Sequence, residues 1–195
     1  MFPPQITASW LIGDDGTPAS VVETWCRATA AASPGIAVLE QVAPGRGLLT
    51  SGRGALIVAG EPAALGGGGD AWCGSRVEAS FARRSEAGSG AVAESSEAPY
   101  LLMTRVSVLD AKREDFREWL DIEHSQRQMS VPGNEWYLGY EELGEGHSFM
   151  NLWGLLRPDV VESETWRRTS STPWRTRMLT AIEGTDRAVY RFIVS

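Results

Sequence analysis

The stretch WLDIEHSQRQMSVPG, residues 119–133, decides the fold class of this chain. It continues a helical pattern in which Phe116, Leu120 and His124 recur at every fourth position, and a Pro-Gly pair then ends it. An alternating, strand-like segment, residues 100–109, precedes the helix, and two aromatic segments follow it. A strand, a helix and a hairpin in this order open a ferredoxin-like β-α-β-β-α-β unit, so we expect an α+β fold.

The remainder of the C-terminal half completes such a unit. The predicted elements are a strand from Tyr100 to Leu109, a helix with Asp110 as its N-cap, a hairpin of Trp136–Leu143 and Ser148–Leu156, a helix from Pro158, a second helical segment with Thr172 as cap and Pro173 at its first position, and a closing strand from Arg187 to Val194.

The N-terminal half repeats this plan in eroded form. Its predicted elements are a strand Ile6–Asp14, a helix Pro18–Ala31, strands Ile36–Val42 and Ala55–Ala59, and a closing strand Val77–Arg84. The first strand begins 19 residues before Trp25, and the strand at Tyr100 begins 19 residues before Trp119. The helix of the first copy is about one turn shorter, and the missing turn is the one that carries Glu123 and His124. A run of glycines, Gly66–Gly69, stands where its second helix should be.

These patterns divide the chain into a degenerate ferredoxin-like repeat at 1–84, a linker at 85–99 rich in Ser, Gly, Ala and Glu, and a second repeat at 100–195. The candidate site lies in the second repeat.

Composition excludes several classes of function. The net charge is −7 with no basic face or tail, so we expect no nucleic-acid partner. No apolar run approaches a membrane span and no signal-peptide pattern stands at the N-terminus, so we expect no membrane association and a cytoplasmic location. Cys26 and Cys73 form no metal-binding or disulfide pattern and are interpreted as reduced thiols. Only one of the 18 basic residues is a lysine, which suggests a GC-rich bacterial source.

Three motifs carry a resemblance to a known group. The motifs are Trp119-Leu-x-x-Glu-His124, Val131-Pro-Gly133 and Thr172-Pro-Trp174. They resemble the dimeric α/β-barrel superfamily of ferredoxin-like proteins, which contains EthD-like proteins, small polyketide cyclases and cofactor-free monooxygenases. In such proteins two four-stranded sheets face each other, usually across a homodimer. The resemblance therefore implies two tandem repeats that form an intrachain pseudo-dimeric barrel, as a monomer or as a homodimer.

The chain also departs from this group. Relatives often carry an apolar residue and a proline just after the histidine, whereas Ser125-Gln126 follow it here. The N-terminal copy has no histidine, so the resemblance implies an asymmetric site.

His124 is the first candidate catalytic residue. It lies on the apolar stripe of its helix, where a buried imidazole needs a hydrogen-bond partner. Asp121, three residues earlier, could orient the ring. Three interpretations stay open: a structural histidine, a general acid/base in a cavity, or a haem or metal ligand. A lone histidine supports the last of these least, and no metal site is predicted.

A second cluster follows from strand alternation. If Val106 and Val108 face the helices, Arg105 points into the barrel, and the same reasoning places Arg191 on the barrel face of the last strand. The residues expected to line a substrate pocket are Trp136, Tyr140, Asn151, Trp153 and Arg191. Such a pocket would suit a flat anionic or phenolic molecule. The alternative is that these aromatic rings fill the interface between the sheets and that the arginines pair with Glu141 or Glu142.

Two functions are consistent with these patterns. The first is a cofactor-independent enzyme that cyclises, dehydrates or oxygenates a small aromatic or polyketide-like substrate. His124, Asp121 and Arg105 would be its catalytic residues. The second is a non-catalytic protein of the same fold that binds a small molecule or assists another enzyme.

Overall fold

The computed structural model describes residues 2–13, 17–32, 37–42, 45–49, 54–60, 74–88, 98–144 and 148–193. The strands are β1 (Gln5–Gly13), β2 (Ala37–Gln41), β3 (Gly54–Ala59), β4 (Gly74–Gly88), β5 (Tyr100–Val108), β6 (Asn134–Glu142), β7 (Ser148–Leu155) and β8 (Ile182–Phe192). The helices are α1 (Ala19–Ala32), α2 (Arg113–Trp119), α3 (Ser125–Met129), α4 (Glu164–Ser170) and α5 (Pro173–Leu179), with short turns η1 (Gly47–Leu49), η3 (Asp110–Lys112), η4 (Leu120–His124) and η5 (Pro158–Glu162).

The strands form one closed antiparallel barrel in the order β1-β3-β2-β8-β5-β7-β6-β4. Within each half the order is that of a ferredoxin-like sheet: β4-β1-β3-β2 in the first and β8-β5-β7-β6 in the second. Two seams join the halves, because β8 pairs with β2 and β4 pairs with β6. The α+β class and the barrel are therefore as expected, while the interpretation of the halves as copies of one unit stays a prediction.

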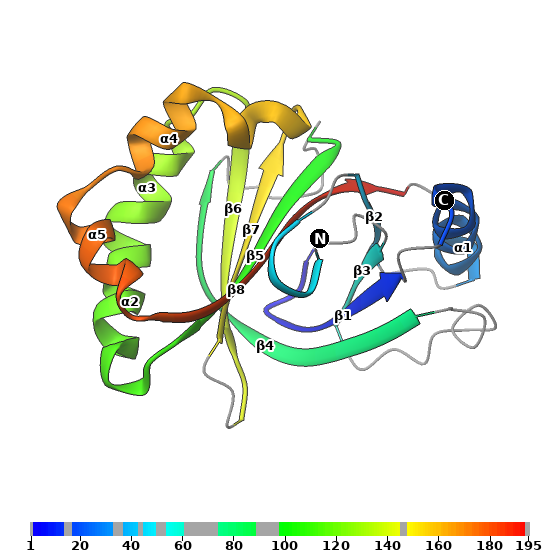
Figure 1. Ribbon diagram of the computed structural model, residues 1–195, viewed down its shortest axis with the longest axis horizontal. Coiled ribbons are helices and arrows are strands. Elements are labelled where there is room, and N and C mark those ends of the chain that lie inside the picture. The colour runs from blue at the N-terminus through cyan, green and yellow to red at the C-terminus, as the bar shows by residue number, and fades with distance from the viewer. Residues whose placement is uncertain are drawn as a thin grey trace.

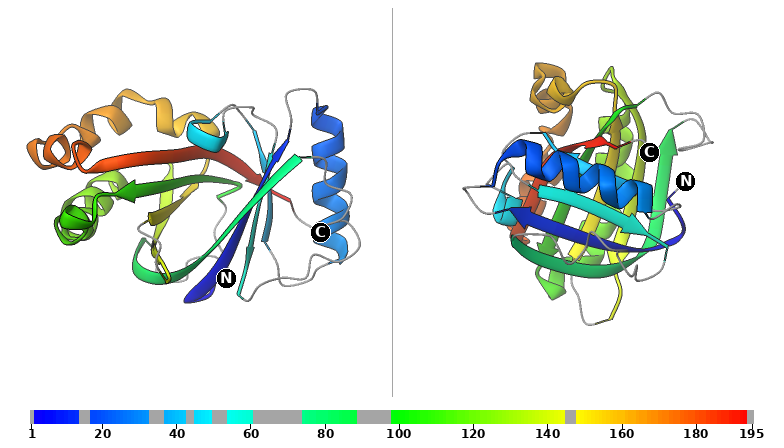
Figure 2. Two further views of the ribbon diagram at one scale, coloured as in Figure 1. Left: turned by 60° about the horizontal axis from the view of Figure 1, so that its bottom comes forward. Right: turned by 90° about the vertical axis from the view of Figure 1, so that its right-hand side faces the viewer.

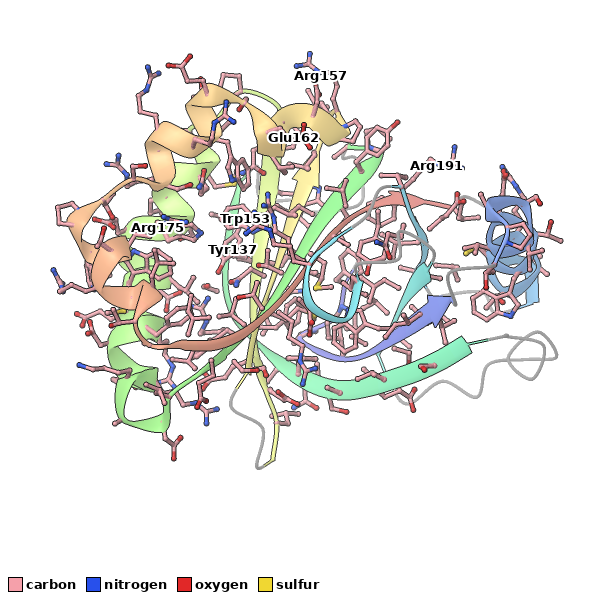
Figure 3. All side chains as sticks on the ribbon, in the orientation of Figure 1. Tyr137, Trp153, Arg157, Glu162, Arg175 and Arg191 are labelled. Carbon is pink, nitrogen blue, oxygen red and sulfur yellow. The ribbon has the colours of Figure 1, made fainter. Side chains whose placement is uncertain are left out.

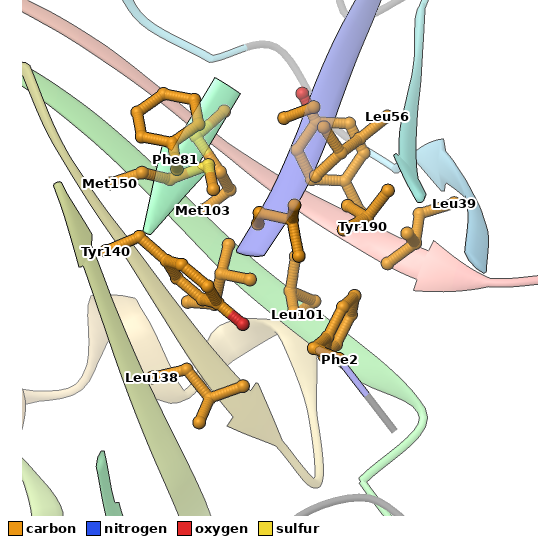
Figure 4. Packing of buried hydrophobic residues seen from close by; sticks show 14 of the residues in the cluster. Phe2, Leu39, Leu56, Phe81, Leu101, Met103, Leu138, Tyr140, Met150 and Tyr190 are labelled. Carbon is orange, nitrogen blue, oxygen red and sulfur yellow. The ribbon is translucent and has the colours of Figure 1, made fainter. Parts of the chain in front are cut away.

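The helices cover the outside of the barrel unequally. Helices α2 to α5 lie against the second half, and α1 covers the first half at the opposite end (Figures 1 and 2). The inside of the barrel is a continuous core of apolar side chains, among them Leu56, Phe81, Leu101, Met103 and Tyr190 (Figure 4). Strands β3 and β7 are covered by this core on their inner face and by other side chains on their outer face. Every residue of these two strands is therefore buried.

Most predicted elements are confirmed within a few residues. Thr172 caps α5 by accepting a hydrogen bond from the backbone N–H of Arg175, with Pro173 at the first position. Asp110 is not the N-cap of the helix: it begins the turn η3, and α2 starts only at Arg113 without a side-chain cap. The last strand begins at Ile182, five residues earlier than predicted, and β4 continues to Gly88, inside the predicted linker. The glycine run 66–69 lies outside the described residues.

Candidate functional site

The predicted site residues lie on two different faces of the C-terminal sheet. Trp136 and Tyr140 face the barrel interior. Asn151 and Trp153 face the helices, since Trp153 packs in a cluster with Trp166 of α4 and Asn151 is bonded to Tyr137 of the same cluster. The prediction that these four side chains line one pocket is therefore wrong.

Inside the barrel, the aromatic side chains are structural. Tyr140 is fully buried and donates a hydrogen bond of 3.1 Å to the carbonyl oxygen of Pro3. Trp136 packs against Phe2, with 6.1 Å between ring centroids. This is the arrangement that the alternative interpretation of the sequence described, in which the aromatic rings fill the space between the sheets.

Arg105 points to the inner side of the sheet, as predicted. Its guanidinium lies 5.4 Å from the ring centroid of Trp10 and pairs with Glu142 at 3.3 Å and with Asp186 at 3.9 Å. The guanidinium is thus held by two carboxylates, and it lies on the face opposite to His124.

The predicted inward orientation of Arg191 is wrong. Its guanidinium lies 2.6 Å from Glu40 of β2 and 4.0 Å from Glu23 of α1, on the outer face of the barrel and away from Tyr137 and Trp153 (Figure 3). Tyr190, the neighbouring residue, takes the inward position and is fully buried. Burial inside the barrel stabilises the apolar ring of Tyr190, whereas it would remove the guanidinium of Arg191 from water. On the outer face that guanidinium pairs with carboxylates instead.

The helix-facing side of the second half contains His124. The helix that begins at α2 widens into the π-helical turn η4, which ends at His124. π-Helical turns often occur at functional sites, because they displace side chains from the regular helical stripe. The imidazole stacks on Trp119 with 4.4 Å between ring centroids and meets the edge of Trp153 at 5.8 Å.

The aromatic surroundings keep His124 neutral. Burial lowers the pKa of its imidazole from the ordinary 6.5 to about 3, and the positive charge of Arg175 acts in the same direction. Near neutral pH the ring is therefore neutral imidazole, so it cannot act as an imidazolium acid and has one nitrogen free to accept a proton.

A chain of three buried polar side chains lies beside Trp153. Arg84 donates a hydrogen bond of 2.8 Å to the hydroxyl of Tyr137, and that hydroxyl donates one of 2.8 Å to Oδ1 of Asn151. The ring of Tyr137 also packs on Trp153, with centroids 4.3 Å apart. Burial raises the pKa of Tyr137 above its ordinary value of 10, so the phenol stays protonated, although Arg84 opposes the shift. The result is a neutral donor held by a cation in an apolar layer.

Gly139 makes room for this chain. A Cβ at this position would lie 2.5 Å from both Nη2 of Arg84 and the hydroxyl of Tyr137, and 2.7 Å from Oγ of Ser85. Gly139 pairs with Asn151 on β7 and with Ser85 on β4, so it lies between the two strands that supply partners to Tyr137. The register of β4 shifts between Arg83 and Ser85, and this irregularity directs Arg84 toward the helix layer.

The acidic residues near His124 have other partners. Asp121 forms an ion pair with Arg84, and its side chain is 34% exposed. Glu123 accepts hydrogen bonds from Trp119 Nε1 at 3.0 Å and from the hydroxyl of Thr172 at 2.5 Å. Asp121 therefore pairs with Arg84 of the Arg84–Tyr137–Asn151 hydrogen-bonded chain, in place of the expected contact with His124.

Sequence reasoning missed Arg84, Tyr137 and Gly139 as site residues. In the sequence, Arg84 only ends the predicted strand Val77–Arg84, and Tyr137 lies within the predicted strand Trp136–Leu143. The glycine two positions after Tyr137 is a sequence signal for space beside the tyrosine side chain. The β-bulge that turns Arg84 toward Tyr137 has no signal in the sequence. Within the described residues, no group of three or more His, Cys, Asp or Glu side chains could hold a metal ion, and no helix is long and apolar enough to cross a membrane.

Comparison with known proteins establishes the architecture. No protein-family model and no curated protein matches the chain. Solved structures do match over nearly the whole length. An anthrone oxidase-like protein has a TM-score of 0.67 at 13% identity, covering 97% of this chain and 91% of that one. A candidate monooxygenase from Fusobacterium nucleatum has a TM-score of 0.62 at 11% identity, covering 100% and 94%.

A third structure names the fold. It is a ferredoxin-fold protein from Listeria monocytogenes related to antibiotic biosynthesis monooxygenases, with a TM-score of 0.54 at 10% identity, covering 100% of this chain and 98% of that one. The chain has the ferredoxin-like α+β architecture. At these identities the similarity concerns the fold alone.

Proposed function

We propose that this protein is a small-molecule enzyme of the monooxygenase type, which needs no bound cofactor and works in the layer between the C-terminal sheet and its helices. The observation that carries this proposal is the buried Arg84–Tyr137–Asn151 chain beside the rings of Trp153 and His124. A fixed cation and a phenol in a dry aromatic layer stabilise a developing oxyanion far better than water does.

The substrate class is a flat aromatic ketone with an acidic CH2 group beside its carbonyl, as in an anthrone. Such a molecule would stack among the flat rings of Trp119, Trp153 and Tyr137, which in this structure are buried and pack on His124 and on each other. Loss of a proton from the CH2 converts the carbonyl oxygen into an enolate. Arg84 would stabilise its charge, and the hydroxyl of Tyr137 would donate to it by turning from Asn151 to the substrate. An anthrone oxidase-like protein among the structural neighbours makes the anthrone itself the first compound to test. Because of this neighbour, we also propose oxygenation as the reaction, in preference to cyclisation or dehydration.

In this scheme His124 accepts the substrate proton. Its pKa of about 3 makes it a weak base in the empty site, but an enolate formed nearby would pair with the imidazolium and raise that pKa. Asp121 is a positioning residue, because it holds the guanidinium of Arg84. Arg105 lies on the inner face, so Arg84 takes the charge-stabilising part that the sequence suggested for Arg105. The overall reaction balances as anthrone plus O2 giving anthraquinone plus H2O, with O2 as the oxidant.

We further infer that the two halves are diverged copies of one unit, so that the single chain is a pseudo-dimer of the dimeric α/β-barrel type. The identical strand order within the halves supports this inference. The pairing of edge strands across the seams also supports it. Through this pairing, Arg84 of the first half reaches Tyr137 of the second half. Membership in the EthD-like or polyketide cyclase subgroups rests only on the three sequence motifs, which contain His124, Val131-Pro-Gly133 and Thr172. The cytoplasmic location also stays a prediction.

The second candidate is a binding or accessory protein without catalysis. The filled barrel interior and the low pKa of His124 favour it, since neither supplies a reactive group near neutral pH.

The test is turnover of anthrone by the purified protein in air-saturated buffer. Anthraquinone formation and O2 uptake should both exceed the protein-free blank, with one O2 consumed per anthraquinone formed. No rate above the blank with anthrone and its hydroxylated derivatives, at protein concentrations near that of substrate, would favour the accessory role.

A further inference from the structure

We propose that a groove on the outer face of the barrel is a second binding site, for a carboxylate carried on an apolar aromatic or aliphatic body. The groove has a volume of about 600 Å³, within the range of small-molecule sites. It lies where the turn after β2 meets β8 and where η5 and α4 overhang, so both halves of the chain contribute to it. Neither Tyr137 nor His124 lines it.

Three arginines from three separate segments line the groove: Arg46 of the turn, Arg167 of α4 and Arg187 of β8. Arg46 and Arg187 are backbone partners, with N–O distances of 2.8 and 3.3 Å. Burial and the neighbouring charge of Arg46 lower the pKa of the half-buried Arg187. Among the residues that the structure describes, none of the three guanidiniums forms an ion pair. Two adjacent guanidiniums without a shared counter-ion are suited to a bidentate anion.

The acidic residues in the groove do not cancel these charges. Asp159 pairs with Arg157 outside the groove at 3.1 Å. Glu162, near the top of the view in Figure 3, is the one carboxylate that acts on Arg187, which it stabilises through space. Three guanidiniums against one available carboxylate leave a positive groove on a protein whose net charge is −7. A single carboxylate on the ligand would reduce this excess from two positive charges to one.

The position of Arg46 is fixed before any ligand arrives. The turn that carries it is closed by a hydrogen bond of 2.8 Å from the N–H of Gly45 to the carbonyl of Leu49. The buried amide of Gln41 donates to the same carbonyl at 2.8 Å. Gly47 has a positive φ of 66°, which favours glycine, and a Cβ at this position would collide with Oδ1 of Asp186 and the carbonyl oxygen of Thr185 in β8. A turn held in this way loses little entropy on binding.

The apolar residues of the groove are the reason for proposing a ligand with an apolar body. Leu102, Val161 and Val189 line the groove and belong to the same apolar cluster as Trp153 and Trp166. An inorganic anion would leave these side chains uncovered, whereas an aromatic or aliphatic acid covers them while its carboxylate reaches Arg187 and Arg46.

The experiment is calorimetric titration of the full chain with 2-naphthoate at neutral pH. We expect saturable binding, a loss of affinity at higher salt, and at least tenfold weaker binding of the uncharged isostere 2-naphthamide. Arg187→Gln and the exposed Arg46→Gln should each weaken naphthoate binding at least tenfold. Arg27→Gln is the matched control: Arg27 pairs with Glu23 on the surface of α1 and does not line the groove, so the affinity should stay unchanged. Circular dichroism of each variant shows that it is folded.

Three outcomes would overturn this assignment. The first is equal binding of naphthoate and naphthamide. The second is unchanged affinity in both Arg46→Gln and Arg187→Gln. The third is binding that Tyr137→Phe weakens but Arg187→Gln does not, because it would place naphthoate in the helix layer instead. Since the readout is affinity, a failure to oxidise anthrone leaves this test unaffected.

Discussion

Arg84 and Tyr137 lie 53 positions apart in the chain and meet across the seam between the two halves of the barrel, where Nη2 of the arginine donates a hydrogen bond of 2.8 Å to the phenol. Arg84 comes from β4 and Tyr137 from β6, and these strands pair only because the barrel closes. Barrel closure therefore brings the cation into a layer that otherwise belongs to the second half.

Gly139 should be intolerant of any side chain. Gly139→Ala would place a methyl group 2.5 Å from Arg84 Nη2 and from the Tyr137 hydroxyl. Such overpacking costs about 1–3 kcal/mol, and displacement of a buried hydrogen bond adds to it. The measurement is the midpoint of urea unfolding. Gly184→Ala is the control, because its Cβ would meet Ser107 at an ordinary 3.9 Å. Equal midpoints for the two variants would show that the close approach at Gly139 does not exist.

His124 should make stability depend on pH in the acidic range. The pKa of its imidazole is about 3 in the folded protein and near 6.5 in the unfolded chain, so the unfolded state binds more protons between these pH values. The contribution is complete above pH 6.5 and is lost as the pH falls toward 3, by at most about 1.4 kcal/mol per pH unit.

The measurement compares the unfolding free energy of the native chain and of His124→Phe from pH 7.5 to pH 4. Phenylalanine keeps a ring between Trp119 and Trp153 but does not titrate. We expect the native chain to lose stability more steeply than the variant, while carboxylates such as Glu141 contribute equally to both. Parallel curves would mean that the folded imidazole titrates normally.

Removal of residues 1–90 should destroy the solubility of the remainder. The deletion removes β1 to β4 and exposes the inner faces of β5 to β8, including Leu101, Met103 and Tyr190. We expect the fragment to aggregate or to dimerise through that face, as judged by light scattering after gel filtration beside the full chain. A soluble, monomeric fragment with native secondary structure would contradict the pseudo-dimer.

The order of elements could be predicted from the sequence because each has a local signal. Residues close together in the sequence are enough to predict these elements. Examples are the alternation of Tyr100–Val108, the helical stripe through Phe116 and His124, and the cap at Thr172. The 19-residue spacing predicts that the two halves are copies of one unit. The strand order is the same in both halves, and the duplication itself stays a prediction.

The site could be predicted only in part, because this sheet is buried on both faces. Along β8, Ala188, Tyr190 and Phe192 face inward, while Val189 and, just after the strand, Ile193 pack outside. Apolar residues therefore occur on both sides. Alternation then shows that Arg191 lies opposite to Tyr190 but not which of the two is inside. The same ambiguity placed Asn151 and Trp153 on the wrong face. The bulge that directs Arg84 is a property of strand pairing, which no local pattern specifies.

Turnover of anthrone by Tyr137→Phe, beside the native chain and Tyr140→Phe, tests the central claim most directly. Each substitution removes one phenolic hydroxyl, and the two tyrosines lie on opposite faces of β6. Only Tyr137 belongs to the Arg84–Tyr137–Asn151 chain. We predict that Tyr137→Phe lowers kcat for anthraquinone formation about 100-fold, the effect of losing one oxyanion donor, while Tyr140→Phe retains kcat within about threefold. Equal rates for Tyr137→Phe and the native chain would contradict the account.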